Sequence, residues 1–149
     1  MQQIILTPIG TIHNEITGPK RSGWEDVTSR IVIDEAWSEH LEGLEDFSHI
    51  LVLFWMHRSP LSSRPPSRIH PRGRADLPLV GLFSTRAPHR PNSIGASVVR
   101  LIERHDNVLT VAGLDAFDGT PVIDIKPFMP ATDNPSDIRT PDWVNKLRT

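Results

Sequence analysis

The stretch over residues 80–130 constrains the fold more than any other part of the chain. It contains short runs with the length and composition of β-strands, and turn-forming pairs lie between them. Asp106-Asn107 and Asp118-Gly119 have the composition of hairpin turns. Short strands joined by tight turns predict antiparallel pairing, with strands over residues 80–85, 95–102, 108–112 and 121–125.

The rest of the chain adds strands and little helix. Residues 47–55 (FSHILVLFW) are almost entirely apolar, which predicts a strand buried on both faces. A strand over residues 4–12 is expected to be interrupted at Pro8, because proline lacks the N–H group that a central ladder needs. The other predicted elements are a strand over residues 29–34, a helical stretch from Asp34 that Gly43 breaks, and a short helix starting at Pro141.

The length of 149 residues sets the scale of the fold. It suits one domain with a core of its own, so we expect a single domain over residues 1–149. About seven short strands and few helices predict a mainly β chain, either an antiparallel barrel or a sandwich.

Charge is distributed unevenly along the chain, although the net charge is only −2. Residues 47–102 carry eight arginines and one acidic residue, whereas the remainder carries eight basic and seventeen acidic residues. The net charge alone argues against nucleic-acid binding, but a basic face on an acidic body is typical of a protein with a phosphate-bearing partner. The alternative is a solvated loop, since residues 58–78 hold five arginines and five prolines without apolar periodicity.

Several classes of protein are disfavoured by what the sequence lacks. It has no cysteine, so disulfides and thiolate metal sites cannot form, and its seven histidines match no zinc-binding spacing. The motifs of Rossmann enzymes, P-loop NTPases and α/β-hydrolases are absent. The longest apolar run, residues 50–56, is too short to span a bilayer, and no signal peptide pattern is present. We therefore expect a soluble cytoplasmic protein without a metal.

The strongest candidate site is the loop over residues 86–95, which combines planar donors with two prolines. The planar guanidinium of arginine can donate two parallel hydrogen bonds to a carboxylate or a phosphate. Asparagine can hydrogen-bond to the edge of an adenine or to the loop's own backbone. Gly95 allows a close approach of the chain or a positive φ angle. The alternative is a structural loop whose arginines pair with Asp115 and Asp118. The residues predicted to hold a ligand with anionic or planar polar groups are Arg86, His89, Arg90 and Asn92.

Two further positions are candidates. Met56 and His57 follow the predicted 47–55 strand, and strand ends commonly present groups to a pocket, although a lone histidine there is more often a hydrogen-bonding core residue. Asp115 lies between two predicted strands and can bind a ribose diol or an ammonium group. Asp118-Gly119 is better explained as a turn.

Four blocks of the sequence resemble one known family. They are IGTIHNE, GLEDFSHILVLFWMH, VGLFSTRAPHRPNSIG and LTVAGLDAFDGTPVIDIKPFMP, and together they extend over nearly the whole chain. In these blocks the chain resembles the TrmO (YaeB/VirR-like) family of S-adenosylmethionine-binding proteins that methylate tRNA. The resemblance implies a single-sheeted antiparallel β-barrel that works as a homodimer, with S-adenosylmethionine bound near the subunit interface. It also implies methyl transfer to N6 of threonylcarbamoyladenosine beside the anticodon of a threonine tRNA.

The family's contacts can be carried onto the matching positions of this chain. The resemblance implies cofactor contacts from four segments: Arg21, Ser22 and Gly23; Met56 and His57; Arg86 and Ala96; and Ala112, Gly113, Leu114 and Asp115. Contacts to the RNA are expected from Arg68, Arg72, Arg74, Arg90 and Asn92. No catalytic residue is assigned, and His57, Asn92 and Asp115 stay open as the base.

The chain departs from the family pattern in three places. Ser93 stands where proline is usual, and Lys20-Arg21 stands where Arg-Gln is common. Longer members also carry an extension after the Lys-Pro-Phe block, which this sequence does not match. Two alternatives therefore stay open: a small-molecule methyltransferase on the same fold, and a regulatory module that binds S-adenosylmethionine without an RNA substrate.

Overall fold

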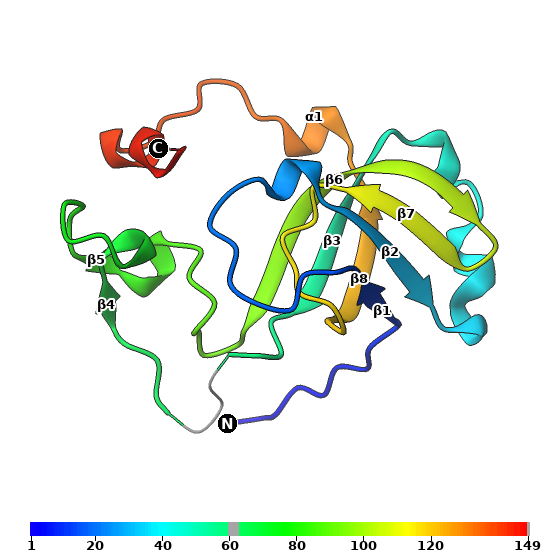
Figure 1. The fold of residues 1–149 in the computed structure, drawn as a ribbon, viewed down its shortest axis with the longest axis horizontal. Coiled ribbons are helices and arrows are strands. Elements are labelled where there is room, and N and C mark those ends of the chain that lie inside the picture. The colour runs from blue at the N-terminus through cyan, green and yellow to red at the C-terminus, as the bar shows by residue number, and fades with distance from the viewer. Residues whose placement is uncertain (60–62, 149) are drawn as a thin grey trace. The chain divides into compact units, whose positions relative to one another are not determined.

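A closed antiparallel barrel of six strands is the main feature of the fold (Figure 1). The computed structural model describes residues 1–59 and 63–148. The strands follow one another around the barrel in the order β1-β2-β7-β6-β3-β8. Their bounds are β1 Gly10–His13, β2 Thr28–Ile33, β3 His49–Trp55, β6 Ile94–His105, β7 Val108–Ala112 and β8 Pro121–Pro127. The prediction of a mainly β chain with an antiparallel barrel is confirmed.

The remaining elements are short. Strands β4 (Arg68–Ile69) and β5 (Val80–Gly81) pair as a separate antiparallel sheet. The chain also forms a single turn of α-helix, α1 (Pro130–Asp133). The 3-10 helices are η1 Trp24–Asp26, η2 Glu35–Leu41, η3 Leu44–Asp46, η4 Pro71–Gly73, η5 Leu82–Ser84 and η6 Asp142–Arg148. Within the described ranges, no helix has the length and apolar character needed to cross a membrane.

Contacts within the chain divide it into two compact units. The first unit contains residues 1–57 and 94–128, and therefore the whole barrel. The second contains residues 58–93 and 129–149, and therefore the β4-β5 sheet. Each unit is described by itself below. That the two units form one domain stays a prediction.

The barrel interior holds the apolar core of the first unit. Each strand contributes alternate residues to it, because successive side chains of a strand point to opposite faces. Residues at most 1% exposed include Ile12, Ile31, Ile50, Val52, Val99, Leu109, Val111 and Val122. This packing fixes the strand register, and the register in turn fixes where the connecting loops begin.

Strand β3 alternates between buried and partly exposed residues, so the prediction of burial on both faces is wrong. Ile50, Val52 and Phe54 point into the barrel, whereas Trp55 is 38% exposed. A closed barrel buries the inner face of a strand, and on the outer face of β3 Leu51 and Leu53 are only partly buried. The apolar residues on that outer face therefore need another explanation, which we consider below.

Gly95 permits a close approach inside the barrel, which is one of the two roles predicted for it. It pairs with Phe54 across the β3-β6 ladder. A Cβ atom built on Gly95 would lie 2.3 Å from the nearest Phe54 ring carbon, closer than real contacts allow. The phenylalanine ring thus occupies the space that any other residue at position 95 would need.

The connections between strands differ in part from the predictions. The Asp106-Asn107 hairpin is confirmed, since His105 pairs with Val108 on either side of it. Asp118-Gly119 forms a turn, with a φ angle of 82° at Gly119, but its flanking strands are not partners. The hairpin predicted there is wrong, because β8 pairs with β1 and β3 instead of β7.

Two other predicted elements are confirmed in place but differ in form. The helical stretch after Asp34 is the 3-10 helix η2, and Gly43 ends it with a φ angle of 87°. The C-terminal helix is η6, also of 3-10 type. The strand predicted over residues 80–85 is wrong beyond Gly81, because residues 82–84 form η5.

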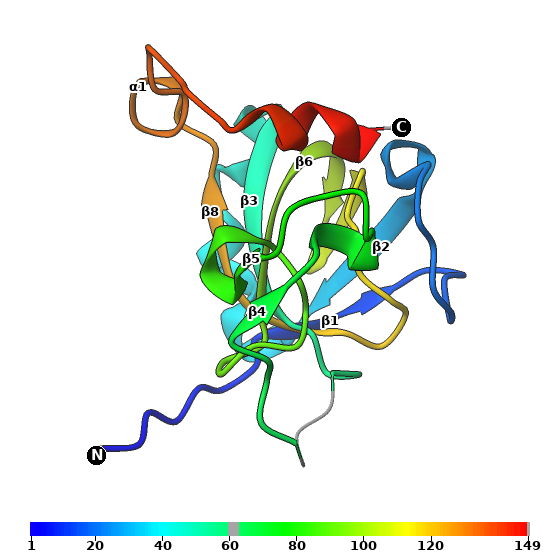
Figure 2. The ribbon, with the colours of Figure 1, turned by 90° about the vertical axis from the view of Figure 1, so that its left-hand side faces the viewer.

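The first residues of the chain form an extended arm instead of the predicted strand. Regular pairing begins at Gly10, and residues 1–8 are all exposed. Ile4 and Ile5 are 85% and 90% exposed. Figures 1 and 2 both show this arm leading away from the strands of the barrel. We call residues 1–8 the N-terminal arm.

Candidate functional site

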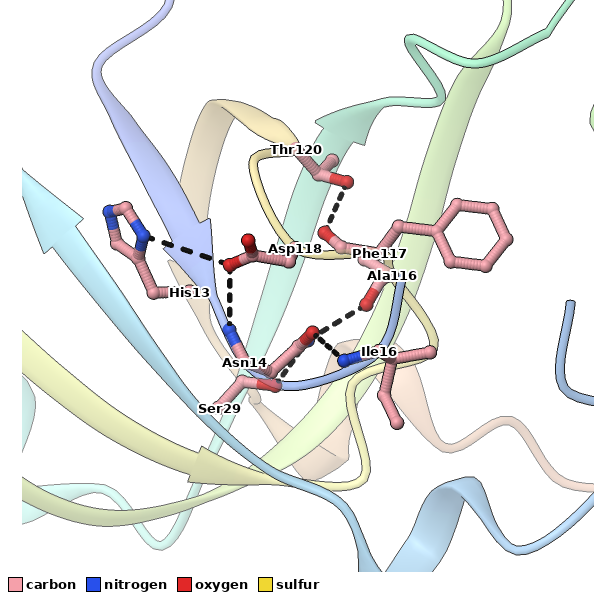
Figure 3. A network of polar contacts seen from close by, with 8 residues as sticks. All are labelled: His13, Asn14, Ile16, Ser29, Ala116, Phe117, Asp118 and Thr120. Carbon is pink, nitrogen blue, oxygen red and sulfur yellow. Dashed lines mark hydrogen bonds and ion pairs between the residues drawn. The ribbon is translucent and has the colours of Figure 1, made fainter. Parts of the chain in front are cut away.

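Asn14, just after β1, anchors the loop that joins β7 to β8 (Figure 3). Its side-chain amide donates hydrogen bonds to Ser29 Oγ at 3.0 Å and to the Ala116 carbonyl oxygen at 2.9 Å. Its own carbonyl Oδ1 accepts the Ile16 N–H at 2.9 Å. Ser29 is only 1% exposed, so the amide satisfies polar groups that water cannot reach.

The same loop is held at its other end by backbone contacts. The Asp118 N–H donates to the Ile16 carbonyl and the Gly119 N–H to the Ile12 carbonyl, both at 2.8 Å. The Asp118 carboxylate accepts the Asn14 N–H at 3.1 Å and lies 3.8 Å from His13 Nδ1. The loop over residues 113–120 is therefore fixed to residues 12–16, and it carries Gly113, Leu114 and Asp115.

Removal of the Asn14 side chain should therefore weaken the fold. We expect Asn14→Ala to lower the free energy of unfolding by about 1–3 kcal/mol, because the Ser29 hydroxyl and the Ala116 carbonyl lose their partner. Urea unfolding followed by tryptophan fluorescence measures this. Asn145→Ala, at an exposed position of η6, is the control and should change stability by less than about 0.5 kcal/mol. An equal effect of the two substitutions would show that Asn14 does not anchor the loop.

Asp115 is held in place from a neighbouring strand. The Ser97 hydroxyl on β6 donates a hydrogen bond to the Asp115 carboxylate. Gly113 has a φ angle of 91°, and its N–H donates to the Val27 carbonyl at 3.0 Å. The carboxylate of Asp115 is exposed and keeps further acceptor sites for a ligand.

The turn-rich segment before β2 lies against the same loop. The Trp24 ring is 6.4 Å from the Phe117 ring, measured between centroids, and its Nε1 donates to the Lys20 carbonyl at 2.9 Å. Gly23 has a φ angle of 78°, which favours glycine there. The structure thus places Trp24 and Val27, which follow the predicted residues 21–23, against the loop that carries the predicted residues 112–115, and Ser97, next to the predicted Ala96, against Asp115. Arg21 and Ser22 are exposed at this place.

Met56 and His57 follow β3, which pairs with β6 up to Trp55 opposite Ile94. Met56 packs against the core. The Nδ1 atom of His57 is buried, and in the part of the chain that the structure describes it has no hydrogen-bond partner. Buried polar atoms are nearly always paired, so this ring nitrogen is available to a water molecule or a ligand. His57 is therefore not explained as a satisfied core histidine.

The loop over residues 85–93 lies in the second unit and is braced from within. Arg90 Nη1 donates to the carbonyls of Thr85 and Ala87 at 2.9 and 3.1 Å, and its guanidinium lies 5.7 Å from the Phe83 ring centroid. His89 Nε2 lies 3.1 Å from the Ser63 carbonyl. Arg86 and Asn92 are exposed. Arg90 thus braces this loop by hydrogen bonds to the loop's own backbone.

The arginines predicted to contact RNA fall into two groups. Arg74 forms a two-point ion pair with Asp76, at 3.1 and 2.8 Å, and its hydrogen bond lowers the pKa of the Asp76 carboxyl. Arg74 also donates to the Lys146 carbonyl at 2.7 Å, and Arg72 donates to the Leu147 carbonyl. Both therefore hold η6 in place. Arg68, in β4, is exposed.

Sequence reasoning missed Asn14, Ser29 and Ser97. Asn14 lies in the IGTIHNE block, and its position directly after a strand is a signal, since asparagine often bonds backbone groups at strand ends and turns. Ser29 and Ser97 carry no such signal, because serine within a strand is common. Across residues 1–59 and 63–148, no group of three or more histidines and carboxylates is placed to hold a metal ion.

Known proteins similar to this chain share one family. A family model described as the tRNA-methyltransferase O N-terminal domain matches residues 10–134. A probable S-adenosyl-L-methionine-binding protein of Pyrococcus abyssi is 37% identical over 96% of this chain and 77% of its own length. The mouse tRNA (adenine(37)-N6)-methyltransferase is 39% identical over 74% of this chain, but only 25% of the mouse protein is matched.

A solved structure gives the same result. The crystal structure of TrmO from Pseudomonas aeruginosa matches 95% of this chain with a TM-score of 0.77 and 33% identity. This chain spans 62% of that chain's length. Because the family model covers most of the sequence, and a relative and a solved structure match nearly all of it, the chain belongs to the TrmO family.

Proposed function

We propose that this protein is an S-adenosylmethionine-dependent methyltransferase that acts on tRNA, with N6 of threonylcarbamoyladenosine as the acceptor. The structural observation that carries the proposal is the anchored loop that presents Asp115, whose carboxylate Ser97 orients. Similar proteins named for S-adenosylmethionine binding, and the mouse tRNA (adenine(37)-N6)-methyltransferase, support the cofactor and the substrate class.

The residues of the first unit fit such a cofactor. The Asp115 carboxylate suits a ribose diol, because each hydroxyl can donate to one of its oxygens. The His57 Nδ1 atom is a buried group that needs a partner. Arg86 belongs to the second unit and is proposed from the family resemblance, as a planar donor to the cofactor carboxylate. The full proposed set is Arg21, Ser22, Gly23, Met56, His57, Arg86, Ala96, Ala112, Gly113, Leu114 and Asp115.

The proposed chemistry depends mainly on positioning. Bound S-adenosylmethionine supplies an electrophilic methyl group. The chain's own residues bind the cofactor, align the acceptor nitrogen and exclude water, and such alignment lowers the barrier of a displacement reaction. N6 of threonylcarbamoyladenosine is a poor nucleophile beside its ureido carbonyl, so a base would help. His57, Asn92 and Asp115 are the candidates for that role.

A homodimer in the cytoplasm is part of the proposal. The outer face of the β3-β6 pair is apolar, with Ile94, Val98 and Ile102 exposed by 42%, 50% and 51% and Trp55 by 38%. Contiguous apolar patches on a sheet commonly mark an interface. A second copy of the chain over this face would account for the apolar outer residues of β3.

Calorimetric titration tests the cofactor part of the proposal, and incubation with total tRNA followed by nucleoside mass spectrometry tests the substrate. We expect saturable binding of S-adenosylmethionine and a mass gain of one methyl group on threonylcarbamoyladenosine. Binding without a methylated nucleoside would favour the small-molecule methyltransferase or the regulatory module. Several similar proteins are named only for cofactor binding, which is why these alternatives are tested. Absence of binding would overturn the proposal.

Arg68 is the proposed RNA contact that can be tested most directly. We expect Arg68→Glu to weaken tRNA binding several-fold at low salt and to reduce the slope of log K against log salt concentration by about 1. Filter binding over a salt series measures both. Arg72 and Arg74 are less suitable, because reversing them also removes the hydrogen bonds to η6. Arg139→Glu, at an exposed position of the second unit, is the control. If log K depended on log salt concentration with the same slope in both variants, Arg68 would not be part of the RNA-binding surface.

A further inference from the structure

A pocket of about 520 Å³ opens in the first unit between β8 and the 3-10 helices η2 and η3. Its wall is largely apolar, with Ile33, Leu44, Phe47 and Ile125 contributing to it, and Trp37 and His40 lie on the η2 side. None of the residues proposed for cofactor or RNA contacts lines this pocket. The pocket therefore lies apart from the proposed cofactor and RNA contacts.

One wall of the pocket is an open strand edge. β1 pairs with β8 only at Val122 and Pro121, whereas β3 pairs with β8 as far as Pro127 on the other side. The Ile125 N–H donates to the carboxylate of its neighbour Asp124 at 2.9 Å, instead of to a strand. Residues 124–127 thus have a partner strand on one side only in the described structure. Pro127 has no N–H and Asp124 occupies the Ile125 N–H, so a strand added to this edge would have to donate to its carbonyl groups.

The N-terminal arm has the properties of a strand that lacks a partner. It holds the run Ile4-Ile5-Leu6, exposed by 85%, 90% and 53%. The arm is joined to Ile9, which itself lines the pocket. Figure 2 shows the arm extending away from the barrel. Three consecutive exposed large aliphatic residues are unfavourable in water, so a surface that buries them is expected.

We propose that the arm of one copy adds as a strand to the 124–127 edge of β8 in a second copy, with its aliphatic side chains in the pocket. In strand addition, main-chain hydrogen bonds to the open edge provide affinity, and pockets that take alternate side chains provide specificity. Exchange of a terminal segment between identical chains is a common route to a dimer. The partner copy then contributes residues that complete the pocket.

Pro8, at the root of the arm, works against continuation of β1 along the 124–127 edge of the same chain. Ile9 is hydrogen-bonded on both sides. Its N–H donates to the Val122 carbonyl at 2.8 Å, and its carbonyl accepts the Asp34 N–H at 2.9 Å. Pro8 has a fixed φ angle and no N–H, so it cannot continue the ladder in a regular way. The N-terminal arm therefore leaves the barrel before Ile9, and Figures 1 and 2 show it leading outward.

Disulfide trapping tests the exchange, and the absence of native cysteines makes it clean. One chain carries Ile5→Cys or Leu6→Cys, so that each face of the added strand is sampled, and carries an affinity tag. A second, untagged chain carries His40→Cys at the exposed side of the pocket. The two are mixed under mild oxidation, and the tagged product is separated by non-reducing electrophoresis. His105→Cys, with a side chain 87% exposed at the β6-β7 hairpin, replaces His40→Cys as the control.

We expect a mixed disulfide with His40→Cys to form at least tenfold faster than with His105→Cys. The double variant Ile4→Asp and Leu6→Asp should raise the dissociation constant for self-association at least tenfold in sedimentation velocity. Equal trapping rates for the two histidine positions would overturn the proposal. A chain carrying both Leu6→Cys and His40→Cys that closes only within itself, at a rate independent of concentration, would also overturn it and show closure onto the same chain.

Discussion

Asp115→Asn is expected to weaken the binding of S-adenosylmethionine by about tenfold to a hundredfold. The carboxylate is exposed, and the Ser97 hydroxyl orients it on a loop that Asn14 fastens. A hydrogen bond to a charged group contributes about 1.5–3 kcal/mol, and asparagine keeps the shape of the side chain but loses the charge. Isothermal titration calorimetry of the purified variant measures the change in Kd.

The matched control is Asp106→Asn at the tip of the β6-β7 hairpin, where the carboxylate side chain is 86% exposed. It makes the same chemical change at a place with no proposed ligand, so the Kd should not change. Ser97→Ala should have a smaller effect than Asp115→Asn, because it loosens the carboxylate without removing it. If Asp115→Asn bound the cofactor as tightly as Asp106→Asn, the anchored loop would not be part of the site.

Gly95→Ala is expected to lower the free energy of unfolding by about 1–3 kcal/mol. A methyl group at this position would lie 2.3 Å from the nearest atom of the Phe54 ring, which is itself 3% exposed and packed in the core. The ring cannot move without displacing its neighbours, because protein interiors are closely packed. Urea unfolding monitored by circular dichroism measures the loss.

A double-mutant cycle with Phe54→Leu separates a steric clash from a general effect of alanine in a strand. Leucine leaves room beside residue 95, so the double variant should be more stable than the sum of the two single losses predicts, with a coupling energy of about 0.5–3 kcal/mol. Gly81→Ala is the control, since nothing lies within 4 Å of a Cβ atom built there. A loss for Gly95→Ala no greater than that for Gly81→Ala would contradict the close approach.

A mainly antiparallel β fold could be predicted because its later strands have strong local signals, whereas the choice of a barrel over a sandwich came from the family resemblance. Alternating apolar residues and the Asp106-Asn107 turn identify β7 with its correct bounds and β6 in its place, although β6 runs on to His105 beyond the predicted end at Ile102. The partner of β8 could not be predicted from the Asp118-Gly119 turn, because the pairing depends on closure of the barrel and not on the turn itself. The apolar run of β3 predicts burial on both faces of the strand, although the barrel buries only its inner face.

The candidate site could be predicted only in outline. The 86–95 loop and Asp115 stand out by composition, since planar donors, prolines and a carboxylate are recognisable in a sequence. The functions of Arg72, Arg74 and Arg90 could not be separated in this way. Each donates to backbone carbonyls in the second unit, and such contacts depend on how segments far apart in the chain meet. Asn14 was missed for the same reason, because its acceptor at Ala116 lies far along the chain.

The pairing of the first barrel strand with the last has a consequence for how the chain folds during synthesis. Gly10 pairs with Val122, and β3 must wait for β6, which follows only after residues 58–93. A ribosome adds about 5–20 residues each second, so the edge of β1 is exposed for several seconds before β8 emerges. Non-local pairing of this kind also slows folding itself, to the range of milliseconds to seconds. The newborn chain thus carries an unpaired strand edge, which favours aggregation, during the interval between the synthesis of its first barrel strand and that of its last.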